Sequence, residues 1–212
     1  MKTLILSLLI ITLCLNAHAA DWNTSGTVRT SGGELHYRVS GTGKPLLLLH
    51  GYSGYGEQWR GFLDEFVDNY KVIAVDLPGH GQSSKLRSSF IIADAARDMW
   101  QLMDHLGVKQ IHGVGYSAGG MTLLQMALQE PSRVQSMVLA ASAFTVLEDR
   151  SGEPFELLPE AYRQDLLRNH NGDMEKIRSM LSAKFVADIK VSDLRDLKTP
   201  TLLVSGDRDE SF

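Results

Sequence analysis

Cysteine is almost absent from this chain of 212 residues, because Cys14 is the only one. The residue before it, Leu13, is larger than the small residue that a lipoprotein cleavage site requires. Once residues 1–19 are removed, the chain has neither a disulfide nor a thiol for catalysis. The chain also lacks a continuous apolar run of about twenty residues, the length that a membrane-spanning helix needs. We therefore expect neither a disulfide-stabilised fold, nor thiol chemistry, nor a permanent membrane anchor.

The first residues nevertheless have the pattern of a secretory signal peptide. Lys2 supplies one positive charge, an apolar run of about twelve residues extends from Leu4 to Leu15, and small residues follow up to Ala19. We expect residues 1–19 to be the signal peptide, with cleavage after Ala19. The mature protein is then secreted or periplasmic, without a stable membrane anchor.

An excess of charge of one sign is also missing. The chain has 21 basic and 25 acidic residues, and removal of the first 19 residues with Lys2 changes the net charge from −4 to −5 over the remaining 193 residues. So mild an acidity predicts no nucleic-acid partner. The histidines and carboxylates show no metal-ligand spacing, and no phosphate-binding Gly-x-x-x-x-Gly-Lys loop occurs, so we expect no metal and no cofactor.

The chain does contain an alternation of buried strands and helices. Apolar runs without polar alternation are typical of strands buried on both faces of a parallel sheet, and they occupy residues 46–49, 72–75 and 134–141. Helical patterns lie between the runs at 56–69 and 89–106, and an antiparallel hairpin at 27–39 precedes them. This order predicts an α/β fold with a doubly wound, mostly parallel sheet.

Residues 145–199 interrupt this alternation, because they contain amphipathic helical patterns and no strong strand. The helical patterns are at 159–169, 173–183 and about 191–197. Their position near strand ends predicts a lid inserted between the first part of the core, 20–144, and its continuation, 200–212. The apolar residues of the lid either line an apolar pocket or pack the lid on the core, and the sequence leaves both possibilities open.

A sharp turn around Ser117 lies between a strand at 111–114 and a helix that begins near Met121. Gly115 and Gly119 flank the serine at two residues' distance, where a tight strand-to-helix turn has no space for larger side chains. Such a turn directs the serine hydroxyl outward. The next amide, that of Ala118, lies at a helix N-terminus, where it has no intrahelical partner. The five-residue pattern alone occurs by chance, but the flanking strand and helix favour a nucleophile.

Four motifs occur in one order, each at a predicted strand end: His50-Gly51-Tyr52, Asp76-Leu77-Pro78-Gly79-His80-Gly81-Gln82-Ser83, Gly115-Tyr116-Ser117-Ala118-Gly119-Gly120 and Pro200-Thr201-Leu202-Leu203-Val204-Ser205-Gly206-Asp207-Arg208-Asp209. Together they resemble the α/β-hydrolase fold family, and the resemblance extends from about Val28 to the end of the chain. The composition of the second motif favours a loop, in which Asp76 and His80 hold turns rather than take part in catalysis.

The resemblance implies a role for each matching position. Ser117 would be the nucleophile, the backbone amides of Tyr52 and Ala118 would form the oxyanion hole, and Asp209 would be the acid, with Asp207 as the competing assignment. A serine hydroxyl needs a base to take its proton and an acid to orient that base. Family members that resemble haloalkane dehalogenases and epoxide hydrolases have an aspartate at this position. A serine here therefore disfavours the reactions of those enzymes.

The sequence departs from the family pattern in its histidines. The family order is nucleophile, acid and then histidine, but no histidine follows His170, which lies in the predicted lid. We therefore expect a C-terminally truncated copy that lacks the last strand, the catalytic histidine and the last helix. Such a copy would leave the strand at 201–205 as an unpaired apolar edge and would be poorly soluble.

These observations predict an exported serine hydrolase that cleaves a carboxylic ester, or a related small-molecule acyl substrate, through an acyl-enzyme. Lactonases, carbon–carbon bond hydrolases and cofactor-free haloperoxidases of the family share this serine, and the sequence does not separate them. The alternative is a non-catalytic ligand-binding protein, or a decayed homologue, which retains the pocket without the histidine base.

Overall fold

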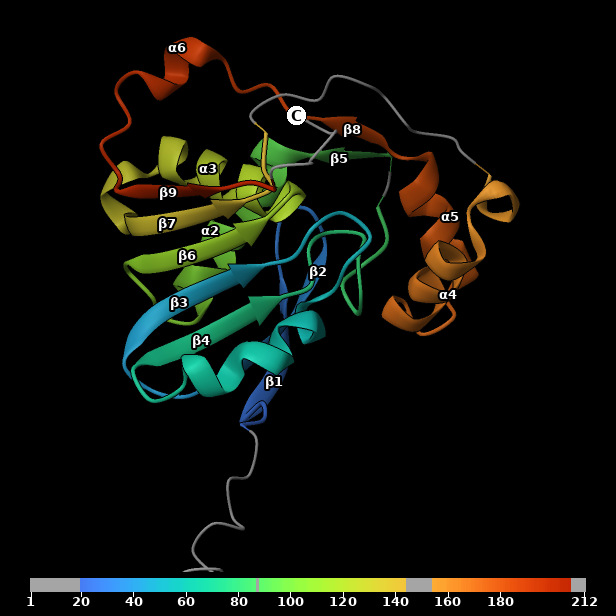
Figure 1. Ribbon diagram of the computed structural model, residues 1–212, viewed down its shortest axis with the longest axis horizontal. Helices are drawn as coiled ribbons and strands as arrows, with labels where there is room; N and C mark the ends of the chain where they lie inside the picture. The colour runs from blue at the N-terminus through green and yellow to red at the C-terminus, as the bar shows by residue number, and fades with distance from the viewer. Residues whose placement is uncertain (1–19, 87, 144–153, 207–212) are drawn as a thin grey trace, which may run out of the picture.

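A computed structural model describes residues 20–86, 88–143 and 154–206 (Figure 1). The predicted signal peptide, both candidate acids Asp207 and Asp209, and the beginning of the predicted lid lie outside these residues. The main sheet has seven strands, namely β1 (Thr24–Arg29), β2 (Glu34–Ser40), β3 (Lys44–Leu49), β4 (Tyr70–Val75), β6 (Ile111–Tyr116), β7 (Val134–Ala140) and β9 (Thr201–Val204).

The sheet is mostly parallel, as the sequence predicts. Its strand order is β1-β2-β4-β3-β6-β7-β9, and the five strands from β4 to β9 in this order are parallel. The hairpin of β1 and β2 adds to β4 in antiparallel orientation. The strands β4 and β6 lie on opposite sides of β3. Since β3 and β6 are parallel neighbours, their carboxyl ends lie side by side.

Both faces of the sheet are covered, which explains the uninterrupted apolar run of β3. Leu47 and Leu49 pack on one face with α2 (Ile92–His105) and α3 (Ala118–Gln129). Leu46 and Leu48 pack on the other face with Leu63 of the 3₁₀ helix η1 (Gly56–Glu65). Alternate side chains of one strand therefore belong to two cores, so every position has to be apolar.

Two predicted helices differ from the structure at their ends. The helix expected over 56–69 is a 3₁₀ helix that ends at Glu65, and it contains two glycines, which lower the stability of an α-helix. The helix expected over 89–106 begins only at Ile92, because the preceding residues form the short strand β5 (Ser89–Ile91). The short 3₁₀ helix η2 (Pro131–Arg133) connects α3 to β7.

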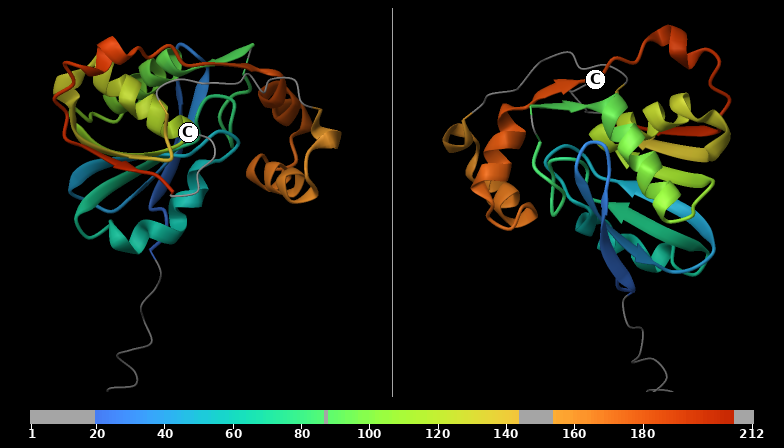
Figure 2. Two further views of the ribbon diagram at one scale, coloured as in Figure 1. Left: turned by 45° about the horizontal axis from the view of Figure 1, so that its top comes forward. Right: turned by 180° about the vertical axis from the view of Figure 1, so that it is seen from behind.

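The described residues 154–199, which we call the helical insertion, contain η3 (Phe155–Leu157), α4 (Glu160–Asn169), α5 (Met174–Ser182), β8 (Lys184–Val186) and α6 (Val191–Leu194). The two longer helices match the predicted ones. The sequence indicated no strong strand here, and the short strand β8, which it did not predict, pairs in parallel with β5 in a separate two-stranded sheet. Figure 2 shows α4 and α5 to one side of the main sheet, with the β5 and β8 pair as the junction.

The insertion has a small apolar core of its own, formed by Leu158, Leu166, Ile177 and Met180.

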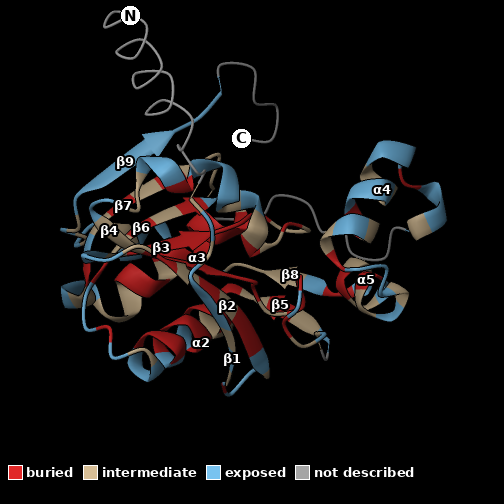
Figure 3. Cartoon of the chain, turned by 90° about the horizontal axis from the view of Figure 1, so that it is seen from below, coloured by how far each residue is buried: buried red, intermediate tan, exposed pale blue. Residues whose placement is uncertain are grey.

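The strand β9 at the edge of the main sheet is exposed along its whole length (Figure 3). Among the described helices, none has both the length and the apolar content needed to cross a bilayer.

Candidate functional site

Ser117 occupies a strained turn between β6 and α3. Its backbone has φ +50° and ψ −119°, a conformation that residues other than glycine rarely adopt and that costs about 1–3 kcal/mol. The Ser117 amide donates a hydrogen bond to the Ala140 carbonyl oxygen at 2.9 Å, and the amides of Gly120 and Met121 donate to the Ser117 carbonyl oxygen. The turn is therefore held from both the neighbouring strand and the following helix.

The two glycines around Ser117 are required by close backbone contacts. A Cβ atom on Gly115 would lie 2.5 Å from the Gly120 Cα atom, and one on Gly119 would lie 2.4 Å from the Leu49 carbonyl oxygen. Both distances are far below van der Waals contact. The glycine spacing predicted to allow the turn therefore has a direct steric cause, which is the packing of the first turn of α3 against β6 and the end of β3.

The loop after β3 lies directly beside the serine. A Cβ atom on Gly51 would lie 3.3 Å from the Ser117 Cβ atom, so the backbone leading into Tyr52 adjoins the turn. Ala118 is the first residue of α3 and is buried, at a position where helix amides have no intrahelical acceptor. The structure thus brings the three sequence-predicted residues Ser117, Tyr52 and Ala118 to the adjacent ends of two parallel strands.

The side chain of Tyr52 connects the β3 loop with the helical insertion. Its hydroxyl donates a hydrogen bond to the Met180 carbonyl oxygen in α5 at 2.8 Å. Its ring makes edge-to-face contacts with His80, Phe90 of β5 and Phe185 of β8, with centroid distances of 4.8, 5.4 and 5.4 Å. Burial raises the pKa of the Tyr52 phenol, so the hydroxyl stays protonated and remains a donor.

His50 is a structural residue, not a candidate base. Its Nε2 atom accepts the Leu77 amide at 2.9 Å, and its Nδ1 atom lies 2.7 Å from the Gly51 carbonyl oxygen, to which it donates. Burial lowers the pKa of His50 to about 4, in agreement with this neutral tautomer. Since both nitrogens are occupied, the imidazole holds the β3 loop against the loop after β4.

Asp76 holds the loop after β4, as the sequence predicts. Its carboxylate accepts the amides of Gly56 and Gln82 and the guanidinium of Arg38, at 2.6, 2.8 and 2.9 Å. Burial alone would raise its pKa, but the neighbouring His36, the Arg38 charge and the Gln82 amide lower it below the usual range. The carboxylate therefore stays ionised and works as a fixed acceptor at the centre of the loop.

His80 and His170 are buried in the same region, with ring centroids 6.0 Å apart. Each has its Nδ1 atom next to a backbone carbonyl oxygen, that of Pro78 for His80 and that of Leu166 for His170. Burial is the largest cause that lowers the pKa of both imidazoles. Both side chains are therefore neutral near pH 7 and pack between the loop after β4 and the insertion.

The acid and base of a triad are not assembled in the described part of the chain. Asp207 and Asp209 lie outside the described residues, and within those residues the Ser117 hydroxyl has no hydrogen bond with a histidine. The described residues also contain no group of three or more histidine, cysteine, aspartate or glutamate side chains able to hold a metal ion.

Sequence reasoning missed two contacts of this region. Ser142, just after β7, donates through its hydroxyl to the carbonyl oxygens of Ala140 and Ser117, at 2.9 and 3.1 Å. Asn169, at the end of α4, donates to the Ser53 carbonyl oxygen at 3.0 Å. The position of Ser142 at the carboxyl end of a strand next to β6 was an available signal. No local pattern indicates the contact of Asn169, because 116 residues separate it from Ser53.

Comparison with known families identifies the fold. The alpha/beta hydrolase fold family matches residues 44–193, which include the strained serine, the β3 loop and most of the helical insertion. The chain belongs to the alpha/beta hydrolase fold family. This α/β hydrolase therefore has the fold that the four sequence motifs indicate.

Individual curated relatives match about half of the chain. The chain is 38% identical over 104 residues to the dihydrolipoyllysine-residue acetyltransferase component of an acetoin cleaving system from Cupriavidus necator, which covers 49% of this chain and 28% of the relative. It is 40% identical over 109 residues to the "Putative carbamate hydrolase RutD" of Variovorax paradoxus, which covers 50% of this chain and 41% of the relative. The chain thus spans less than half the length of these two curated relatives.

A solved structure supports the fold over a longer range. A hydrolase from Pseudomonas aeruginosa superposes with a TM-score of 0.69 and covers 88% of this chain and 81% of its own, at 24% sequence identity. At 24% sequence identity, this superposition supports the fold of the chain and not a particular activity.

Proposed function

We propose that this α/β hydrolase is an exported serine hydrolase that cleaves a carboxylic ester or a related small-molecule acyl substrate through an acyl-enzyme. The observation that carries the proposal is the strained backbone of Ser117, φ +50°, at the end of β6 and beside the loop after β3. Strain of this kind persists where the surrounding structure holds it, and it is concentrated at active sites.

In the proposed reaction, the Ser117 Oγ atom attacks the acyl carbon while a histidine base takes the hydroxyl proton. The resulting oxyanion accepts hydrogen bonds from the backbone amides of Tyr52 and Ala118. Each of these hydrogen bonds lowers the activation barrier by about 3 kcal/mol. Collapse of the intermediate expels the alcohol, which receives the proton from the histidine, and water then hydrolyses the acyl-enzyme by the same steps. Asp209, or less favourably Asp207, would orient the histidine.

The names of the two relatives are compatible with acyl chemistry. One is named as an acetyltransferase and the other as a carbamate hydrolase, and both names describe reactions at the carbon of an acyl group. A strand-end serine with two backbone donors suits such a carbon, because the tetrahedral intermediate places its negative charge at the carbonyl oxygen.

The decisive experiment labels the natural full-length protein with a fluorophosphonate probe, which reacts with activated serine hydroxyls. We expect labelling of the wild type and none of Ser117→Ala. Ser132→Ala removes an exposed hydroxyl from η2 and is the matched control that keeps the label. Labelling that persists in Ser117→Ala would refute Ser117 as the nucleophile.

The base is tested separately, because no histidine follows His170 in the 212 residues. The coding DNA past codon 212 and the intact mass of the product determine whether a histidine follows the candidate acids. A frame that continues through another apolar strand to a histidine supports the hydrolase. A stop codon directly after Phe212 favours a non-catalytic ligand-binding or decayed homologue, for which we would expect tight ligand binding without turnover.

Export is tested by the N-terminus of the protein recovered from its natural compartment. Cleavage of a signal peptide after Ala19 gives a mature chain that begins at Ala20, outside the cytoplasm. N-terminal sequencing of the recovered protein measures this directly. An N-terminus at Met1 in cytoplasmic fractions would contradict the proposal.

A further inference from the structure

The loop at residues 51–54, which we call the oxyanion loop, is held by two different helices of the insertion. The Tyr52 hydroxyl donates to the Met180 carbonyl oxygen in α5 at 2.8 Å, and Asn169 at the end of α4 donates to the Ser53 carbonyl oxygen at 3.0 Å. One bond therefore holds a side chain of the loop and the other holds its backbone. Together they tie the loop to both longer helices of the insertion.

The oxyanion loop needs such external support, because its own backbone is strained. Ser53 has φ +66°, which residues other than glycine rarely adopt, and the Gly54 amide donates to the Gly51 carbonyl oxygen at 3.0 Å to close the turn. A conformation of this kind persists only where surrounding contacts determine it. Loss of the contacts from the insertion is thus expected to let the loop relax.

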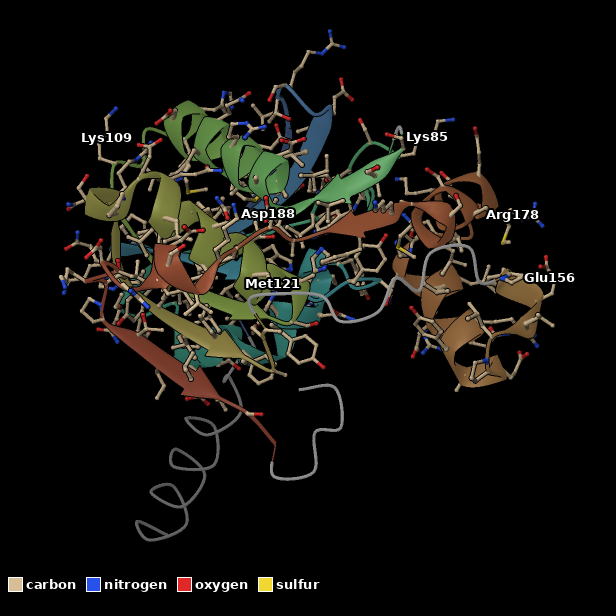
Figure 4. The ribbon with its side chains drawn as sticks, turned by 90° about the horizontal axis from the view of Figure 1, so that it is seen from above. Lys85, Lys109, Met121, Glu156, Arg178 and Asp188 are labelled. Carbon is tan, nitrogen blue, oxygen red and sulfur yellow. The ribbon has the colours of Figure 1, made fainter. Side chains whose placement is uncertain are left out.

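Besides these two hydrogen bonds, the Tyr52 ring packs against Phe185 of β8 and the apolar core of the insertion. Among the described residues, the other side-chain hydrogen bonds and ion pairs between the insertion and the core do not touch this loop. Ser179 of α5 donates to the Leu86 carbonyl oxygen and Lys176 to that of Gly81, both at 2.8 Å. Lys85 forms an ion pair with Glu175 at the surface. In Figure 4, Lys85 lies where the core meets the insertion, whereas Glu156 and Arg178 lie together on the insertion's outer side, 3.3 Å apart. The chain therefore offers contacts that attach the same helices elsewhere.

We propose that Tyr52 and Asn169 are positioning residues, through which docking of the helical insertion holds the Tyr52 amide at the place where the oxyanion forms. This inference rests on the proposed function, because it assigns the Tyr52 amide as an oxyanion donor. The insertion acts on the reaction through the backbone of the loop and not through contact with the reacting atoms. A loosened loop leaves the substrate pocket in place but moves the donor, so the loss falls on the transition state.

The first test measures hydrogen exchange of the Gly54 amide by NMR in the natural full-length protein. Tyr52→Phe retains the ring but removes the hydroxyl donor, and we expect the Gly54 amide to exchange about fivefold faster. Ser179→Ala is the matched control, since it removes one hydrogen bond from the residue next to Met180 without touching the loop. We expect no change at Gly54 in this variant. Equal acceleration in both variants would mean that the contact only stabilises the insertion, which overturns the proposal.

The second test uses steady-state kinetics with a simple ester. We expect kcat to fall about tenfold in Tyr52→Phe and in Asn169→Ala, with KM unchanged, and both constants to stay at the wild-type values in Ser179→Ala. A raised KM with an unchanged kcat would overturn the proposal, because it indicates a role in substrate binding.

The two proposals fail in different ways. Activity that persists in Ser117→Ala removes the hydrolase mechanism, but the exchange of the Gly54 amide still reports whether the insertion holds the loop. Unchanged exchange in Tyr52→Phe removes the coupling and leaves the hydrolase mechanism intact.

Discussion

Gly119 shows how much a single residue position determines at this site. A Cβ atom there would lie 2.4 Å from the Leu49 carbonyl oxygen and 2.5 Å from that of His50, and both are backbone atoms that cannot rotate away. We expect Gly119→Ala to displace the first turn of α3, to lower the thermal midpoint by several degrees and to reduce kcat/KM about a hundredfold.

The matched control for this prediction is Gly61→Ala. Gly61 lies in η1 with nothing within 4 Å of the added Cβ atom, so we expect unchanged activity and a melting temperature that is not lowered. Differential scanning calorimetry and ester hydrolysis measure both quantities. A Gly119→Ala variant that melts and reacts like the wild type would show that the backbone at the turn is not closely packed.

At the residue scale, the sequence predicted the positions that depend on local backbone geometry. Ser117, Gly115 and Gly119 belong to one turn, so their spacing alone indicates the bend. The contact between the Tyr52 hydroxyl and Met180 joins positions 128 residues apart, and a tyrosine in a loop has many possible partners. Contacts of this kind depend on how two elements dock, and the sequence carries no local pattern for them.

The junction between the loops and the insertion is expected to respond to pH. Burial lowers the pKa of His80 and His170, and lowers that of His50 to about 4. In the unfolded chain all three titrate near 6.5. Below that pH the unfolded chain binds protons that the folded chain does not, so the free energy of unfolding falls as the pH decreases. Burial of His50 alone accounts for a loss of about 2 kcal/mol between pH 7 and pH 5.

Urea unfolding at pH 7 and pH 5 measures this loss. His170→Gln is expected to reduce the difference between the two pH values, whereas His105→Gln, at the exposed end of α2, is expected to leave it unchanged. The lowered pKa of Asp76 does not interfere, because its stabilising contribution is lost only as the pH falls below the usual carboxylate range. A free energy of unfolding that does not change between pH 7 and pH 5 would show that these imidazoles are solvated.

At the scale of elements, α4 and α5 could be predicted because helical periodicity is local. The strands β5 and β8 could not, since each has three residues and pairs with a partner 95 positions away. Phe90 and Phe185 are adjacent only after the insertion docks, so the strand character of both segments comes from tertiary packing. Tertiary packing also holds η1, whose Trp59 and Leu63 pack against the sheet although the sequence of this segment favours a regular α-helix poorly.

At the scale of the whole molecule, the apolar strand β9 lies at an edge of the main sheet within the described residues, at the position where the sequence analysis expects an apolar edge. Leu202, Leu203 and Val204 of β9 are 58, 71 and 48% exposed. The strand pairs with β7 on one side and has no strand on its other side within the described residues. Such an edge offers backbone donors and acceptors together with apolar side chains, a combination that promotes association between chains.

We therefore expect the 212-residue chain to associate, and Leu203→Lys to reduce this association by placing a charge on the edge. Light scattering and size-exclusion chromatography at matched concentrations measure the effect. Phe62→Lys is the control, because Phe62 is 53% exposed but lies on η1, away from any strand edge, so the same charge should change association little. If both substitutions help equally, net charge is the cause and the edge is not. A monodisperse, cooperatively melting 212-residue chain would contradict the prediction, because the β9 edge would then be tolerated in solution without a cover.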